Sequence, residues 1–188
     1  MRLHIFGASS SGVTTLGLAL SEKLSIPYID SDDYFWERAE PPYTLRRKPA
    51  ERNALVQQAL QSTSWILGGS VIDWGADVFP AFDLVVFLWV PPAIRMARLK
   101  KRELERYGTV IYTDPGRKQQ YEDFLAWAAD YDPGTGIANR TLQAHEQWMQ
   151  QLSCPVLQLR GDYTTEEQVE QVMNKLLLSG YPGISATV

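Results

Sequence analysis

The first 24 residues constrain the fold more than any other part of the chain. An apolar run, RLHIF at residues 2–6, leads directly into GASSSGVTT at residues 7–15. Leu16, Leu20 and Leu24 then recur at the spacing of one helix face. A strand that enters a helix through a loop bounded by glycines can curl its backbone N–H groups inward, and the helix N-terminus adds partial positive charge. The sequence therefore predicts a loop that can hold a phosphate group.

This loop differs at one position from the phosphate-binding pattern G-x-x-x-x-G-K-[ST], because Val13 stands where the lysine belongs. That lysine normally contacts the β- and γ-phosphates and stabilises charge as the γ-group transfers. Valine cannot do this, but the backbone donors and the Thr14 hydroxyl, which would reach Mg²⁺, are retained. Phosphate binding is thus a safer inference than catalysis. The expected nucleotide-binding loop comprises Gly7, Ala8, Ser9, Ser10, Ser11, Gly12, Val13, Thr14 and Thr15.

Two other interpretations of the loop were considered. Any strand-to-helix turn can use glycine and serine for structural reasons alone. GASSSGV also differs by one residue from the GASSG turn of short-chain dehydrogenases, which would bind a dinucleotide. That class needs a later Tyr-x-x-x-Lys, but the residues four positions after Tyr34 and Tyr43 are arginines, and no other tyrosine comes closer. The dinucleotide interpretation is therefore set aside.

Along the rest of the chain, short apolar runs alternate with helical patterns, which is typical of a parallel α/β sheet. We expect a single domain over residues 1–179 with a helical lid at about 108–140, and a frayed tail at 180–188. The strands are expected at residues 2–6, up to about 30, 65–69, 84–90 and 156–159. The helices are expected to follow the loop and to cover 49–60, 92–107, 118–130, 139–151 and a final segment after Thr164 or Thr165. In the helix at 49–60, Ala54, Leu55 and Leu60 are the expected inner side.

Composition excludes several classes of function. The 188 residues carry a net charge of −4, which argues against a general nucleic-acid binder. Cys154 has no cysteine partner, and His4 and His145 are too far apart in the sequence to suggest a metal site. The longest apolar run, residues 84–90, is far too short to cross a membrane. We expect a cytoplasmic monomer that binds neither membranes nor nucleic acid.

One segment is strongly basic. Residues 95–118 contain eight lysines and arginines against three acidic residues, and Arg95, Arg98, Arg102 and Arg106 share one helix face. A charged stripe is usually a solvated face. Arginine, however, suits bidentate phosphate contacts, so Arg98 and Arg102 are the favoured phosphate ligands. Ala97 and Leu104 would lie opposite them and face the core.

These features together resemble the P-loop kinases of nucleoside monophosphates, shikimate and similar small molecules. The resemblance rests on the loop, on DSDD after the second strand, on DLVVFLWVPP and on Arg98-x-x-x-Arg102, and it covers about residues 1–178. IDSDDYFW, PPYTLRRKP and WAADYD are similar more narrowly to bacterial adenylate-kinase-related proteins and to P-loop proteins of the DNA-topology-modulation type. The adenylate-kinase-related group also replaces the loop lysine, so Val13 is consistent with a group trait.

The resemblance implies a P-loop NTPase three-layer fold with ATP and Mg²⁺ as cofactors. It implies that Arg140 returns from the lid to the phosphates, with Arg117 as a second candidate, and that Arg160 lies near the base. Asp30 would sit by the metal, and Asp32 would orient or deprotonate the acceptor. The proposed catalytic residues are therefore Arg98, Arg102, Arg140 and Asp32.

The acceptor side is less well defined. Asp32, Asp33, Arg47 and Gly69 are the candidate substrate-binding residues. The aspartates could instead cap a helix, and the basic cluster at 46–52 could simply flank Pro49 at the surface. The Gly-x-Pro-Arg segment of adenylate kinases is missing after the third strand, where the chain reads GGSVIDWG.

The sequence therefore favours a Mg²⁺-dependent phosphotransferase that moves the γ-phosphate of ATP to a small-molecule acceptor. A nucleotide-binding regulatory module without phosphoryl transfer is the alternative, favoured by Val13. A DNA-associated role is suggested only by the second resemblance, and the net charge of −4 counts against it.

Overall fold

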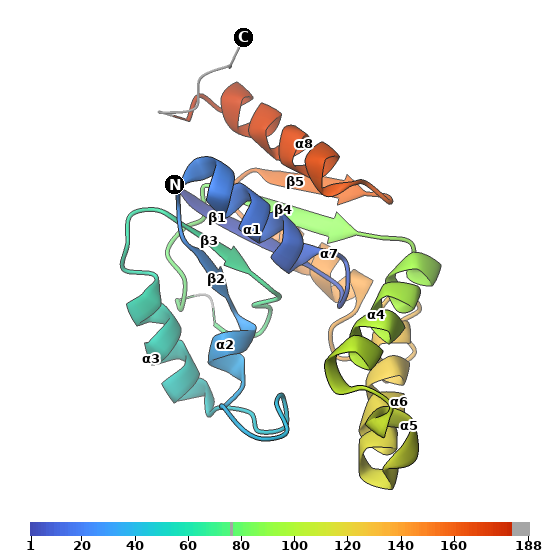
Figure 1. The fold of residues 1–188 in the computed structure, drawn as a ribbon. Helices are drawn as coiled ribbons and strands as arrows, with labels where there is room; N and C mark the ends of the chain where they lie inside the picture. The colour runs from blue at the N-terminus through green and yellow to red at the C-terminus, as the bar shows by residue number, and fades with distance from the viewer. Residues whose placement is uncertain (76, 182–188) are drawn as a thin grey trace.

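The computed structural model of the protein describes residues 1–75 and 77–181. Within them, five parallel strands form one sheet in the order β2-β3-β1-β4-β5 (Figure 1). The strands are β1 (Arg2–Gly7), β2 (Tyr28–Asp30), β3 (Trp65–Gly68), β4 (Leu84–Trp89) and β5 (Val156–Arg160). The expected α/β class with a five-stranded parallel sheet is confirmed.

Helices connect the strands and cover both faces of the sheet (Figure 1). They are α1 (Val13–Leu24), α2 (Asp32–Phe35), α3 (Pro49–Ala59), α4 (Pro92–Tyr107), α5 (Val110–Thr113), α6 (Pro115–Ala129), α7 (Leu142–Gln150) and α8 (Thr165–Leu178). The short helices α2 and α5 were not expected, because one turn carries no periodic signal in a sequence.

The central strands are buried on both faces, as parallel strands between helical layers are. In β1, Leu3 and Ile5 pack under α1 and α8, whereas Phe6 faces the opposite cluster with Met149 of α7. β4 repeats this alternation, and β3 packs under α3. The sheet therefore holds β1 between two apolar layers, and the loop that follows it emerges at the carboxyl edge, where it lines a cleft.

The helices α4, α5 and α6 stand together beyond the carboxyl end of β4 (Figure 1). This is the edge where ligands bind in open α/β sheets. Gly108 ends α4 as expected, with φ of 67°. The α5–α6 segment falls within the expected lid at 108–140.

The inward face of α4 differs from the expectation. Ala97 and Leu104 are exposed, while Arg95, Leu99 and Glu103 are buried. Arg95 is only 1% exposed because its Nη1 donates to the Ala128 carbonyl at 2.8 Å and its Nη2 to Asp132 Oδ2 at 2.8 Å. The α6 end therefore supplies acceptors that let an arginine occupy a core position.

The inner side of α3 also differs from the expectation. Ala54 and Leu55 are exposed, and only Leu60 of the three expected residues is buried. Arg52 and Val56 point inward instead, and the Arg52 guanidinium lies 4.0 Å from the Trp74 ring centre. A cation stacked on an aromatic face replaces the aliphatic contact that the sequence suggested.

The final helix begins where the sequence predicted. Thr164 forms a capping box with Glu167, which fixes the start of α8. Of the expected tail at 180–188, Tyr181 packs partly against the cluster under α1 and α8, and residues 182–188 lie outside the described residues. Among the described helices, none has the combination of length and apolar character that a membrane span requires.

Candidate functional site

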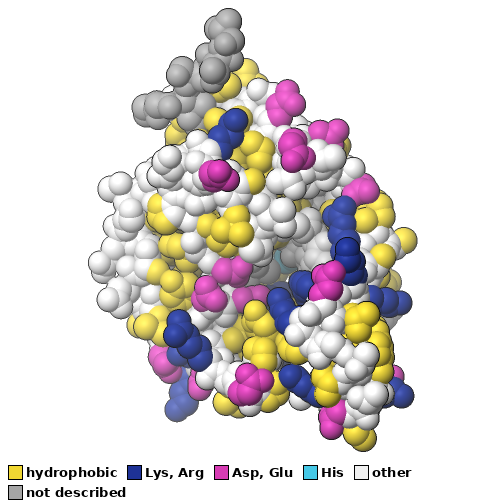
Figure 2. Space-filling model, viewed as in Figure 1, with side chains coloured by type: hydrophobic (Ala, Val, Ile, Leu, Met, Phe, Trp, Pro, Cys, Tyr) yellow, Lys and Arg dark blue, Asp and Glu magenta, His cyan; other side chains and the backbone are white. Residues whose placement is uncertain are grey.

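A cleft of about 1240 Å³ opens at the carboxyl edge of the sheet, between the loop after β1 and the α4–α6 helices. Figure 2 shows acidic side chains on one side of a central hollow and basic side chains on the other. The cleft brings together all the candidate site residues except Arg47 and Arg160. Its walls include residues 7–15, Asp30, Asp32, Asp33, Gly69, Arg98, Arg102 and Arg140.

The glycine loop has the geometry of an anion cradle. Ser10 and Gly12 adopt left-handed conformations with φ of 65° and 98°, and Ser11 N donates to the Ala8 carbonyl at 3.1 Å. A Cβ atom on Gly7 would overlap the Leu88 carbonyl oxygen, so this position requires glycine. The turn therefore holds its backbone in a compact curve of the kind that binds anions.

Several donors in the loop have no partner within the described part of the chain. The buried hydroxyls of Ser10 and Ser11 make no hydrogen bond, and no side chain caps the start of α1 at Gly12. Buried hydroxyls left without partners cost free energy, and a phosphate oxygen would satisfy them. The loop thus fits a nucleotide phosphate in spite of Val13.

Val13 itself is half-buried and packs partly against the apolar cluster under α1. It also lines the cleft. The residue at the lysine position therefore contributes to the core, and it brings no charge to the phosphate loop.

Thr14 and Asp30, the two residues expected at a Mg²⁺ ion, lie in contact beside this loop. Thr14 Oγ1 donates to Asp30 Oδ2 at 3.3 Å, and the Tyr28 hydroxyl donates to the same oxygen at 3.1 Å. No group of three or more His, Cys, Asp or Glu residues in residues 1–75 and 77–181 could hold a metal by itself. Thr14 and Asp30 would supply a hydroxyl and a carboxylate oxygen to a Mg²⁺ ion, which prefers oxygen ligands.

The acidic residues at the end of β2 and the start of α2 both stabilise the helix start and line the cleft. Asp30 Oδ1 accepts from the Asp32 backbone N–H at 3.0 Å, which stabilises the start of α2. Burial raises the pKa of Asp32, the nearby Asp30 charge raises it further, and Arg140 and Arg102 oppose the shift. Burial and Asp30 also raise the pKa of Asp33. A carboxylate with a raised pKa is a better proton acceptor, which agrees with the general-base role expected of Asp32 but does not test it.

The three arginines that were expected to be catalytic all line the cleft, but their guanidinium groups have different partners. Arg98 is ion-paired with Asp162 in the loop after β5, and Arg102 donates to Glu103 Oε1 at 3.1 Å. Arg140 lies over the Phe35 ring, with 5.3 Å between its guanidinium carbon and the ring centre. Burial lowers the pKa of Arg140, while Asp32 opposes that shift.

Arg47 was expected at the acceptor side, but it does not line the cleft. Its guanidinium donates to the Tyr34 carbonyl at 3.0 Å, the Trp36 carbonyl at 3.1 Å and Glu51 at 3.0 Å. The three guanidinium nitrogens of Arg47 therefore all bind the chain between α2 and the start of α3. The neighbouring Arg46 lines the cleft in its place.

Arg160 was expected near the base, but it too lies away from the cleft. It pairs with Glu146 at 2.7 Å and donates to Gln158 at 2.9 Å, on the side of the sheet that carries α7. Tyr163, Thr164 and Thr165, a few residues further on, line the cleft instead. Strand alternation explains the difference, because the last side chain of β5 points to one face only.

Two groups of cleft residues were missed from the sequence. Tyr121, Phe124 and Trp127 form an aromatic wall on α6, and their i, i+3, i+6 spacing is a signal that could have found them. Ser70 and Tyr131 hydrogen-bond the two nitrogens of His145 at 2.9 and 2.8 Å. No local pattern joins these three residues, since they are distant in the chain.

Comparison with known proteins places the chain in a family. YqaC of Bacillus subtilis (strain 168), an uncharacterized protein, is 41% identical over 175 residues, which span 93% of this chain and 96% of YqaC. The chain belongs to the YqaC family. No protein-family model matches the sequence.

Solved structures show which fold this YqaC-family protein has. Deoxyadenosine kinase from M. mycoides aligns with a TM-score of 0.55 and 19% identity, over 95% of this chain and 100% of that enzyme. Shikimate kinase from Bacteroides thetaiotaomicron aligns with a TM-score of 0.53 and 20% identity, over 94% of this chain and 98% of that enzyme. The fold is therefore that of the P-loop kinases, as the sequence predicted.

Proposed function

We propose that this protein is a Mg²⁺-dependent phosphotransferase that moves the γ-phosphate of ATP to a small-molecule acceptor. The observation that carries the proposal is that one cleft holds the phosphate loop, the Thr14–Asp30 contact and the arginines Arg98, Arg102 and Arg140. A kinase needs these three elements because phosphoryl transfer depends on positioning and charge stabilisation.

Each part of the cleft has a proposed role. The backbone N–H groups of residues 8–14 hold the phosphates, and Thr14 and Asp30 hold Mg²⁺, which supplies charge neutralisation when bound. Asp32 takes the proton of the acceptor oxygen as that oxygen bonds to the γ-phosphorus. The bond from phosphorus to the bridging oxygen breaks, and ADP leaves. Residues 108–140 act as the lid over this site, within one domain that works as a cytoplasmic monomer.

The arginines replace the missing lysine in this scheme. Arg98 and Arg102 come from α4, and Arg140 comes from the loop before α7, so they reach the cleft from two elements. Arg98 must release Asp162, and Arg102 must turn from Glu103, to contact a phosphate. The Arg98–Asp162 pair is partly exposed on both sides, so breaking it costs little free energy. Turning Arg102 away costs more, because the Glu103 side chain is only 8% exposed and loses its partner.

A second candidate function is nucleotide binding without transfer. Two observations favour it, namely that Val13 brings no charge to the loop and that Arg98 and Arg102 already have carboxylate partners. Such a module would bind ATP through the same loop but would have no use for a cleft-lining Asp32 with a raised pKa.

Calorimetric titration with ATP, with and without Mg²⁺, tests the proposal. We expect a Kd near the micromolar range, about −8 kcal/mol, that weakens when Mg²⁺ is withheld. Thr14→Ala should remove most of the Mg²⁺ dependence, whereas Leu18→Ala, an exposed change on α1, should leave it unaltered. Binding without transfer to any acceptor in a broad screen would support the module, and an absence of ATP binding would reject both functions.

A further inference from the structure

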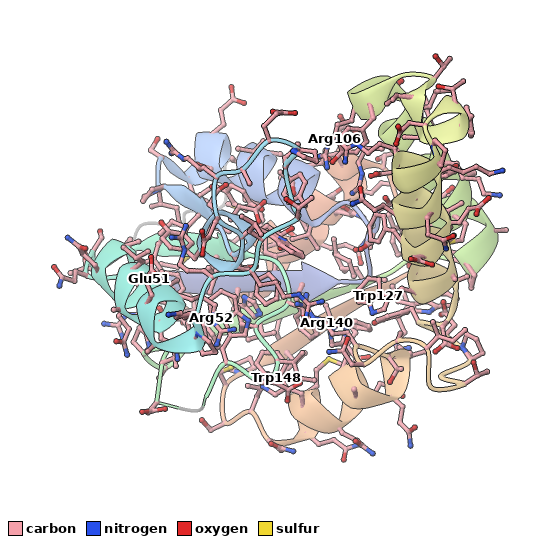
Figure 3. All side chains as sticks on the ribbon, turned by 90° about the horizontal axis from the view of Figure 1, so that it is seen from below. Glu51, Arg52, Arg106, Trp127, Arg140 and Trp148 are labelled. Atoms are coloured by element: carbon pink, nitrogen blue, oxygen red, sulfur yellow. The ribbon has the colours of Figure 1, made fainter. Side chains whose placement is uncertain are left out.

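Asp30, one of the two residues proposed to hold Mg²⁺, ends a strand that also carries Tyr28. Successive side chains of a strand point to opposite faces, so these two residues of β2 share one face. The Tyr28 hydroxyl donates to Asp30 Oδ2 at 3.1 Å. β1 runs towards Arg140 and Trp127, which line the cleft (Figure 3), and β2 ends at the same edge of the parallel sheet. Tyr28 does not line the cleft, so its phenol reaches Asp30 from within the fold.

Two glycines make room for this phenol. The Tyr28 ring packs partly against the apolar cluster under α1 and α8. It passes close to Gly17 of α1 and Gly68 of β3, and a Cβ atom on either glycine would overlap it. Neither glycine has a positive φ, so the close approach of the ring is what favours glycine at these positions. The ring is thus held in one place, and its hydroxyl has little freedom to leave Asp30.

The Asp30 carboxylate accepts hydrogen bonds at both of its oxygens. Oδ1 accepts from the Asp32 backbone N–H at 3.0 Å, and Oδ2 accepts from Thr14 Oγ1 at 3.3 Å as well as from Tyr28. Thr14 is itself proposed as a Mg²⁺ ligand, so it cannot also serve as a lasting support for Asp30. Among the described residues, Tyr28 is therefore the side chain that can keep hold of Oδ2 at a metal site.

A phenol in this position would act on a metal ligand by orienting it. Tyrosine is neutral near pH 7 and meets a carboxylate as a hydrogen-bond donor. Hydrogen bonds from outside the coordination sphere fix the direction of a ligating oxygen, and their loss typically lowers metal affinity roughly 10–100-fold. A phenylalanine would fill the same space beside Gly17 and Gly68 without this bond. The hydroxyl, and not the ring, is thus the group that distinguishes the two residue types here.

We propose that Tyr28 is a positioning residue, whose hydroxyl holds the Asp30 carboxylate in the orientation that receives Mg²⁺. The proposal deepens the proposed function, on which it rests for the identity of the ion. Tyr28 touches neither the nucleotide nor the acceptor in this scheme, because it lies outside the cleft lining. Its contribution is therefore separable from that of the phosphate loop.

Calorimetric titration of Tyr28→Phe with ATP, in Mg²⁺ and in EDTA, tests this role. The Kd in Mg²⁺ should rise about tenfold, while the Kd in EDTA should stay within about twofold, since the phosphate loop is untouched. Tyr112→Phe is the matched control, because it removes the same hydroxyl from an exposed residue outside the cleft lining. The control should bind ATP as the wild type does in both conditions.

Combination with Asp30→Ala shows whether Tyr28 acts through Asp30. The double variant should bind ATP in Mg²⁺ as Asp30→Ala alone does, because a phenol without its carboxylate partner has nothing to position. A further loss in the double variant would mean that Tyr28 acts by another route, for example through Thr14, and would overturn the proposal. A Kd in Mg²⁺ that Tyr28→Phe leaves unchanged would overturn it as well.

The orientation of Asp30 is also measurable without a metal, which separates this proposal from the proposed function. NMR couplings that report the Asp30 χ1 rotamer are compared in Thr14→Ala and in Thr14→Ala/Tyr28→Phe, where Thr14 no longer holds Oδ2. One rotamer in the first protein and a mixture in the second would support the positioning, and in a protein whose ATP binding ignores Mg²⁺ they would leave only the phosphotransferase rejected. The same rotamer in both would overturn the positioning, even if Mg²⁺ strengthens ATP binding.

Discussion

At the scale of single residues, the site depends on which arginines are already neutralised. Arg95 is a core residue, Arg47 and Arg160 hold loops and strands in place, and Arg98 and Arg102 carry exposed or partly exposed ion pairs. The same residue type thus serves packing, local structure and the cleft within one chain. Only the partner of each guanidinium distinguishes these roles.

Alanine substitutions of Val13 and Arg102 are expected to have very different effects on the rate of phosphoryl transfer. Arg102→Ala should abolish turnover, because the scheme gives this side chain the charge that a loop lysine usually carries. Val13→Ala should leave turnover nearly unchanged and lower the free energy of unfolding by about 1 kcal/mol, because Val13 packs against the core. Steady-state kinetics and urea unfolding measure the two effects. Loss of activity in a folded Val13→Ala protein, with Arg102→Ala still active, would contradict the compensation.

At the scale of elements, the loop between α6 and α7 is organised by one buried carboxylate. Asp130 is 3% exposed and accepts hydrogen bonds from the Thr135 N–H at 2.7 Å, the Thr135 hydroxyl at 2.6 Å, the Ile137 N–H at 2.9 Å and the Ala138 N–H at 2.8 Å. These bonds hold the pKa of Asp130 well below its usual range. The loop leads directly to Arg140, so its order decides where that arginine lies.

Asp130→Asn should loosen this loop without unfolding the domain. An amide carries no charge, and its NH₂ group would face the backbone N–H groups of Ile137 and Ala138 in place of an acceptor. Hydrogen exchange at these two amides should become faster by about tenfold or more, while amides in β1 and β4 keep their protection. Asp123→Asn on the exposed face of α6 is the matched control. Unchanged exchange at residues 137 and 138 would show that the loop is held by other contacts.

At the scale of the whole molecule, two buried histidines couple folding to pH. His4 is fully buried beside Phe6 and Phe82, and burial lowers its pKa to about 4. Burial, Arg140 and His4 lower the pKa of His145 to about 3. Both imidazoles are therefore neutral in the folded protein at pH values where an unfolded histidine, with its ordinary pKa near 6.5, is protonated.

The free energy of unfolding should therefore fall as the pH falls below 6.5. The unfolded chain binds more protons than the folded one between 6.5 and the lowered pKa values, so the stability present above pH 6.5 is progressively lost in acid. Each histidine should contribute a loss of about 2 kcal/mol at pH 5. The raised pKa values of Asp32 and Asp33 act in the opposite direction.

Urea unfolding at pH 7 and pH 5 measures this loss, and His4→Phe isolates one contribution. Phenylalanine preserves the stacking with Phe6 and Phe82 but does not titrate. The variant should lose about 2 kcal/mol less between the two pH values, whatever its stability at pH 7. An identical pH dependence in both proteins would mean that His4 does not carry the effect.

The sequence alone determined the strands, the longer helices, the phosphate loop and the P-loop kinase fold. These features depend on residues that are close in the chain, such as the run RLHIF followed by GASSSGVTT, and parallel strands place their carboxyl ends at one edge without further information. The meeting of Thr14 with Asp30 follows from the same rule, since Asp30 is the last residue of β2 and Thr14 lies in the first turn of α1, both at that edge.

Only the tertiary structure decided where the arginines point and which aromatic residues form the cleft. Leu104 faces solvent, whereas Arg95 faces the core. Arg95 can be buried there because Asp132 and the Ala128 carbonyl accept hydrogen bonds from its guanidinium. Arg46, and not Arg47, lines the cleft, because three acceptors near Arg47 occupy its guanidinium. A side chain's role depends on partners that are distant in the chain, and a local pattern does not contain them.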